Sequence, residues 1–100
     1  MLTSKQRAYL RSMANGLDPI FHIGKSGVTP EITTAIDDAL EARELLKANI
    51  LDNCLMEARE TAQMVAERTH SEVVQVIGSR FVLYRQAKKP AIELPKAKKE

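Results

Sequence analysis

The chain has little of what most small catalytic or membrane proteins need. It contains one cysteine, Cys54, no tryptophan and four aromatic residues in 100 positions. A lone cysteine cannot form an internal disulfide, so we expect a reducing, cytoplasmic environment. No apolar run approaches the roughly 20 residues of a membrane-spanning helix, and the basic N-terminal segment has no apolar stretch typical of a signal peptide. We therefore expect one soluble globular domain.

Side chains for catalysis or metal binding are also scarce. His22 and His70 are isolated and lack the spacing of metal ligands, so we expect no metal site. No nucleophile lies in a recognisable pattern with a base. The sequence therefore predicts a protein with no enzymatic activity, no cofactor and no small-molecule substrate.

Charge is present but strongly segregated along the chain. Residues 1–30 carry a net charge of +3, residues 31–72 carry −6 and residues 73–100 carry +5. A fold that brings the two basic segments together would have one face for a polyanion and another face that repels it.

Apolar periodicity predicts alternating helices and strands. Thr3 with Gln6, and Thr29 before Pro30, indicate helix starts, and Asn53 is expected to cap a third helix. The predicted elements are a helix from about Ser4 to Asn15, a strand Pro19–Ile23, a helix from Pro30 to about Ala42–Glu44, a strand Leu45–Leu51, a helix ending near His70–Ser71, and strands Val73–Ile77 and Arg80–Arg85.

This element order predicts an α/β fold, α-β-α-β-α-β-β, with two layers and a four-stranded mixed sheet. Right-handed crossovers favour parallel pairing of the early strands, and Gly78-Ser79 suits a tight antiparallel hairpin. From Lys88 the composition changes to lysine, proline and alanine. We therefore expect a domain over 1–87 and a flexible basic tail over 88–100.

The segment Gly24-Lys25-Ser26-Gly27 stands between a predicted strand and a capped helix. Glycines allow the backbone to approach a ligand closely, and the N-terminus of the next helix attracts anions. A GxxG loop that opens a helix holds nucleotide backbones in KH-type RNA-binding proteins. A P-loop would need a glycine where Pro19 stands, so this loop favours RNA over a nucleoside triphosphate.

The four aromatics argue against an RRM-type binding surface. Phe21, Phe81, Tyr9 and Tyr84 all fit core or half-buried positions. The sheet therefore lacks the exposed aromatic pair on which RRM domains stack bases. We expect phosphate and backbone contacts to dominate recognition.

Three segments in the same order resemble the CRM domain family (chloroplast RNA splicing and ribosome maturation) in its stand-alone bacterial form. They are Pro19–Thr29 ("PIFHIGKSGVT"), Glu44–Ile50 ("ELLKANI") and Val74–Arg85 ("VQVIGSRFVLYR"). The resemblance covers about residues 1–87. It implies a fold similar to the C-terminal domain of bacterial initiation factor three, RNA contact at the Gly24–Gly27 loop and a basic site at Arg85. It also implies a non-catalytic role in large-subunit ribosome assembly on rRNA.

The leading hypothesis is a monomeric, non-catalytic RNA-binding protein. Its candidate RNA-binding residues are Gly24, Lys25, Ser26, Gly27, Arg11, Arg85, Lys88, Lys89, Lys5 and Arg7. Those on the first helix are chosen for charge alone. Two alternatives remain: an adaptor whose acidic helices dock a basic protein, and a small nucleotide-binding enzyme.

Overall fold

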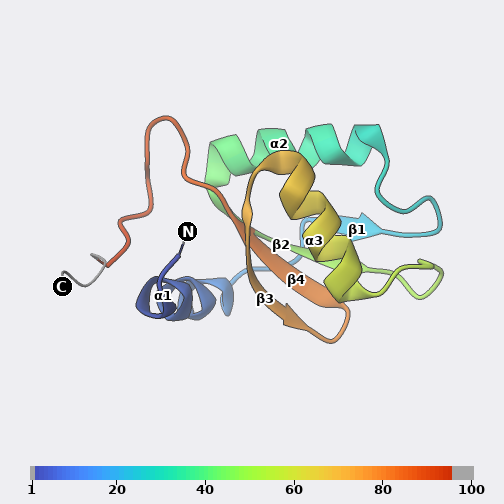
Figure 1. The fold of residues 1–100 in the computed structure, drawn as a ribbon, viewed down its shortest axis with the longest axis horizontal. Coiled ribbons are helices and arrows are strands. Elements are labelled where there is room, and N and C mark those ends of the chain that lie inside the picture. The colour runs from blue at the N-terminus through green and yellow to red at the C-terminus, as the bar shows by residue number, and fades with distance from the viewer. Residues whose placement is uncertain (1, 96–100) are drawn as a thin grey trace.

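The computed structural model describes residues 2–95, which form three helices and one four-stranded sheet (Figure 1). The elements are α1 (Ser4–Ala14), β1 (Phe21–Ile23), α2 (Pro30–Arg43), β2 (Leu45–Ile50), α3 (Ala58–Thr69), β3 (Glu72–Ile77) and β4 (Arg80–Tyr84). The predicted α/β class and the order of elements are confirmed.

The sheet is mixed, as predicted, with the strand order β1-β2-β4-β3. β1 pairs with β2 in parallel, and β4 lies between β2 and β3, antiparallel to both. The carboxyl ends of β1, β2 and β3 therefore meet the start of β4 at one edge of the domain. We call this edge the loop end; it carries residues 24–28, 51–57 and 78–79.

Helices cover both faces of the sheet (Figure 1). On one face, Ile36 of α2 and Val65 of α3 belong to a buried cluster with Phe81. On the other face, Leu10 of α1 packs in a second cluster with Val82. The predicted two layers therefore become three, because the narrow apolar stripe of α1 packs on the opposite face from α2 and α3.

Local signals placed two of the three helix starts correctly. The Thr3 hydroxyl accepts from the Gln6 N–H at 3.1 Å, and the Thr29 hydroxyl accepts from the Ile32 N–H at 3.1 Å. The predicted cap at Asn53 is wrong, because the chain turns there and α3 starts five residues later, at Ala58. Leu55, which a helix starting after Asn53 would include, lies before α3 and is 94% exposed.

The chain after β4 folds back over α1, and we call residues 87–94 the C-terminal strap. Its anchor is the buried carboxylate of Glu44, which accepts from the N–H groups of Ala87 at 2.8 Å, Ala91 at 2.8 Å and Ile92 at 2.6 Å. The described part of the predicted tail, up to Pro95, thus contacts the domain, while its predicted flexibility remains a prediction. The predicted tail residues 96–100 lie outside the described residues.

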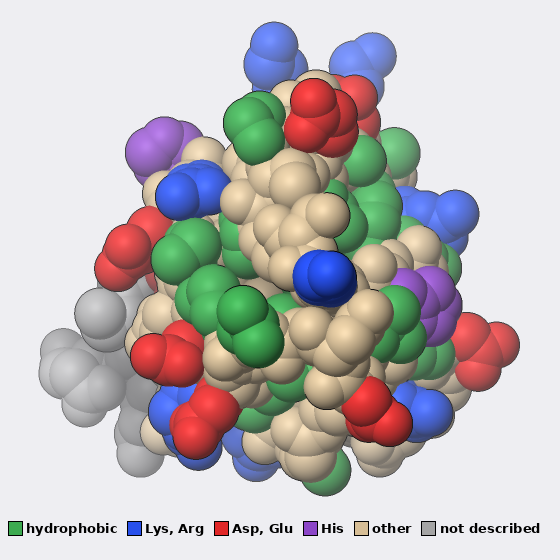
Figure 2. Space-filling model, turned by 90° about the vertical axis from the view of Figure 1, so that its right-hand side faces the viewer, with side chains coloured by type: hydrophobic (Ala, Val, Ile, Leu, Met, Phe, Trp, Pro, Cys, Tyr) green, Lys and Arg blue, Asp and Glu red, His purple; other side chains and the backbone are tan. Residues whose placement is uncertain are grey.

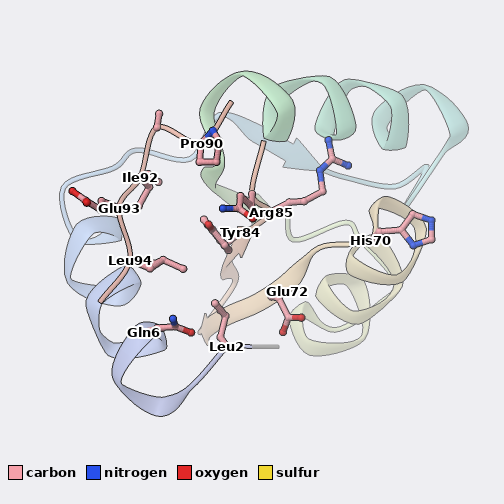
Figure 3. Close-up of a pocket in the computed structure, with 12 residues that line it drawn as sticks. Leu2, Gln6, His70, Glu72, Tyr84, Arg85, Pro90, Ile92, Glu93 and Leu94 are labelled. Atoms are coloured by element: carbon pink, nitrogen blue, oxygen red, sulfur yellow. The ribbon is translucent and has the colours of Figure 1, made fainter. Parts of the chain in front are cut away.

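Apolar contacts also hold the strap. Ile92 and Leu94 pack with the cluster around Leu10, and the Gln6 side chain donates to the Pro95 carbonyl at 2.9 Å. Figure 3 shows Ile92 and Leu94 on the strap facing Tyr84 across a cavity of about 750 Å³. The strap is therefore part of the packed structure of the domain.

The Glu44 anchor makes stability depend on pH in one direction. Burial alone would raise the pKa of Glu44, but the N–H donors of Ala87, Ile92 and Ala91 outweigh it and hold the pKa below its ordinary value of 4.5. A lowered folded-state pKa stabilises the fold above the unfolded-state pKa, and this stabilisation is lost as pH falls through the folded value. We expect urea unfolding below pH 4.5 to show a steeper loss of stability in the native chain than in Glu44→Gln. Parallel profiles for the two proteins would contradict this assignment.

Candidate nucleic-acid interface

The Gly24–Gly27 segment forms a tight turn at the loop end. The Gly27 N–H donates to the Gly24 carbonyl at 2.9 Å, and the side chains of Lys25 and Ser26 at the centre of the turn are exposed. Gly27 has a φ of +68°, a conformation that glycine adopts at low cost. No heavy atom lies within 4 Å of a Cβ placed on Gly27. The turn is therefore open to a ligand.

The base of the turn is fixed against the neighbouring loop. The Leu51 N–H donates to the Ile23 carbonyl at 2.8 Å. A Cβ on Gly24 would lie 3.1 Å from the Asn53 Oδ1 atom and 3.3 Å from the Leu51 Cδ1 atom. Gly24 thus allows two loops to approach closely, while Gly27 keeps the tip of the turn unobstructed. The two glycines have different structural roles.

The turn leads directly into the N-terminus of α2, where the helix dipole is positive. The Gly27 N–H is used within the turn, where it donates to the Gly24 carbonyl. No backbone hydrogen bond within residues 2–95 uses the N–H groups of Lys25, Ser26 or Val28. These three donors, together with the Lys25 ammonium and the Ser26 hydroxyl, are groups of the kind that bind anions in proteins.

One cation near the loop was missed by the sequence analysis. The Arg68 guanidinium of α3 donates to the Val28 carbonyl at 3.3 Å. Because 40 residues separate the two, no local pattern could have indicated this contact. Figure 2 looks onto the loop end and shows a lysine or arginine at its centre, with acidic side chains toward the periphery. The tip of the turn, Lys25 and Ser26, is exposed.

Arg85 has a different position from the one that its charge suggested. Its guanidinium contacts the Asp37 carboxylate at 2.5 Å and the Glu41 carboxylate at 3.5 Å, and it donates to the Thr69 carbonyl at 2.8 Å. Arg85 follows β4 and therefore lies at the opposite end of the sheet from the loop end. Its side chain, 20% exposed, connects α2 to the end of α3. Asp37 and Glu41 of α2 are the carboxylate partners in this connection.

The remaining predicted cations lie apart from the turn. Lys88 and Lys89 are exposed on the strap, beside Arg85. Lys5, Arg7 and Arg11 belong to α1, and the Arg7 guanidinium donates to the Val73 carbonyl of the edge strand β3. Figure 1 shows α1 at the far side of the domain from the turn, so its three cations do not flank Lys25. Arg80 of the C-terminal basic segment, by contrast, begins β4 at the loop end.

Two other kinds of site are not found in residues 2–95. No group of three or more His, Cys, Asp or Glu side chains in this range is arranged to hold a metal ion. None of its helices combines the length and the apolar character needed to cross a bilayer.

These features define a small α/β domain with a mixed sheet and an exposed glycine-flanked turn at the end of an edge strand. The chain belongs to the CRS1/YhbY (CRM) domain family, whose sequence profile matches residues 2–85. The family resemblance seen in the three sequence segments is thus confirmed over nearly the whole domain.

Relatives of similar length share this domain. The chain is 45% identical over 96 residues to the Bacillus subtilis protein named "Probable RNA-binding protein YqeI", covering 95% of this chain and 100% of that one. It is 32% identical over 99 residues to a Haemophilus influenzae protein named "RNA-binding protein", covering 95% and 96%. A solution structure of a hypothetical Staphylococcus aureus protein, described as a candidate RNA binder, matches with a TM-score of 0.80 and 51% identity, covering 95% of this chain and 100% of that one.

Proposed function

We propose that this protein is a non-catalytic RNA-binding protein that holds the sugar–phosphate backbone at the Gly24–Gly27 turn. The observation that carries the proposal is the exposed turn with three free N–H groups and a lysine at its tip, in a chain whose relatives are named as RNA-binding. A phosphate oxygen accepts from the N–H groups, and the Lys25 ammonium supplies charge. Charge-assisted hydrogen bonds of this kind are short and strong.

The proposed cellular role is assembly of the large ribosomal subunit through rRNA, in the cytoplasm. The family resemblance supports this role, and the site fits it, since phosphate contacts position a protein on RNA without reading sequence. The proposed protein acts as a monomer without a cofactor. Crosslinking in cells followed by sequencing of the attached RNA tests the role, with rRNA of large-subunit precursors as the expected product.

The salt dependence of RNA binding tests the phosphate contact. We expect Lys25→Gln to weaken binding to a large-subunit rRNA fragment and to reduce the slope of log affinity against log salt by about 1, because one counterion fewer is released. Fluorescence anisotropy over a salt series measures both quantities. Arg43→Gln is the matched control, since Arg43 is an exposed cation at the far end of α2. An equal change in slope for both variants would contradict a specific role for Lys25.

The adaptor alternative has weaker support. Three carboxylates of the acidic middle are engaged within the domain, since Asp37 and Glu41 contact Arg85 and Glu44 binds the strap, and the relatives are named as RNA-binding. Pull-downs with and without RNase separate the two functions. We expect the protein's partners to be lost after RNase treatment, whereas an adaptor would retain them.

A further inference from the structure

The sheet face that carries α1 is only partly covered, and its uncovered part is polar. Strand pairing places its outward side chains in two rows. We call these residues the open sheet face: His22, Asn49, Arg80 and Ile77 in the first row, and Lys47 and Gln75 in the second, on either side of Val82, which is buried in the cluster with Leu10. The first row crosses all four strands and begins on β1, immediately before the Gly24–Gly27 turn.

The open sheet face has the charge of a surface for a polyanion. Its two rows include the cations Lys47 and Arg80 and no carboxylate. His22 and Arg80 are exposed, and Ile77 is 63% exposed although it is a large apolar residue. The face therefore combines positive charge with an apolar contact, which suits a ligand that has both phosphates and uncharged flat surfaces.

The side chains of the first row also match the chemistry of unpaired bases. An imidazole and a guanidinium are both planar groups on which RNA-binding proteins stack bases. Between them, the Asn49 amide is held in place by the Ser79 hydroxyl, which donates to its Oδ1 atom at 2.9 Å. An amide can pair with the edge of a base that is not already in a duplex. This row supplies stacking that the scarcity of aromatic residues had seemed to exclude.

The second row borders a shallow depression of about 140 Å³, lined by Asn15, Lys47, Gln75, Ile77, Arg80 and Val82. Amide groups thus continue from the first row toward the end of α1. Neighbouring strands lie about 4.8 Å apart, so a row across four strands extends about 14 Å. That length accommodates a few nucleotides of a single strand.

We propose that the open sheet face binds unpaired nucleotides of the same RNA whose backbone the Gly24–Gly27 turn holds. The inference deepens the proposed function and rests on it. The turn fixes one phosphate at the end of β1, and the following bases lie across β2, β4 and β3. The bases of an A-form duplex are stacked in the helix interior, so a duplex cannot lie on this face in the same way.

The test uses labelled RNA of about 12 nucleotides, within the site sizes of single-strand binders, as a single strand and as a duplex. We expect the double variant His22→Ala/Arg80→Gln to lose about ten-fold or more in affinity for the single strand, the range of stacking contributions. Affinity for the duplex should change no more than in the control Arg43→Gln. Thermal unfolding by circular dichroism verifies that each variant is folded.

Two outcomes separate failure of this inference from failure of the proposed function. The double variant and Arg43→Gln could have the same affinity for the single strand, while Gly27→Asp still weakens binding. In that case the open sheet face is not a binding surface. If Gly27→Asp also leaves affinity unchanged in a folded protein, the turn itself is wrongly assigned. Mapping of amide NMR shifts with the single strand gives an independent result. We expect changes on all four strands, and changes confined to residues 24–29 would overturn the inference.

Discussion

Gly27→Asp is expected to weaken RNA binding by about 2 kcal/mol or more, roughly 30-fold in affinity. A Cβ at Gly27 projects into open space beside the free N–H groups of the turn. An aspartate there places a negative charge where the phosphate would lie. Filter binding at fixed salt measures the effect.

The backbone itself requires a control. Gly27 has a φ of +68°, so any side chain introduces some strain. Gly27→Asn adds a neutral side chain of the same shape, and asparagine tolerates this conformation about as well as aspartate. We expect Gly27→Asn to retain most of the affinity and both variants to unfold at similar temperatures. An equally large loss in the asparagine variant would assign the effect to backbone geometry rather than to charge.

Glu44→Ala is expected to cause the largest loss of stability, about 3 kcal/mol. The substitution leaves three N–H donors without an acceptor, of which that of Ala87 is buried and those of Ala91 and Ile92 are part-buried. An unsatisfied buried donor costs about 1–3 kcal/mol. Release of the strap into water limits the total, because the freed N–H groups then bond to solvent. Urea unfolding measures the loss, and limited trypsin digestion at Lys88 and Lys89 measures release of the strap.

Asp38→Ala is the matched control for Glu44→Ala. Asp38 lies on the exposed side of α2, six residues before Glu44, and no hydrogen bond or ion pair within residues 2–95 involves its side chain. We expect its stability to change by no more than about 0.5 kcal/mol and its digestion rate to match the native chain. If Glu44→Ala behaves like this control, the carboxylate does not anchor the strap.

The sequence predicted features that depend on near neighbours. The hydroxyl caps at Thr3 and Thr29 act over three residues, and the hairpin turn at Gly78 needs only a positive φ, which the structure shows at +58°. The start of α3 was missed because the turn at Asn53 packs beside Gly24, which is distant in sequence. Asn53 followed by helical periodicity looks like a helix cap in the sequence, and this local pattern contains no sign of the contact with Gly24.

The candidate site was predicted in part for the same reason. The Gly24–Gly27 turn is a local motif, and the structure exposes it as expected. Nothing near Arg85 in the sequence indicates an ion pair, because its partner Asp37 lies 48 residues earlier. Glu44 looked like the end of a helix, although its acceptor role depends on residues 43 to 48 positions later. Charge alone cannot distinguish a surface cation from one that holds two helices together.

The Glu44 anchor also has a consequence for synthesis of the chain. Glu44 is translated 43 residues before Ala87, the first of its donors, which is a delay of roughly two to ten seconds at bacterial elongation rates. Until then this carboxylate must stay hydrated, and the surface of α1 that the strap later covers stays exposed to solvent. The nascent domain therefore completes its packing only after β4 and the strap have left the exit tunnel.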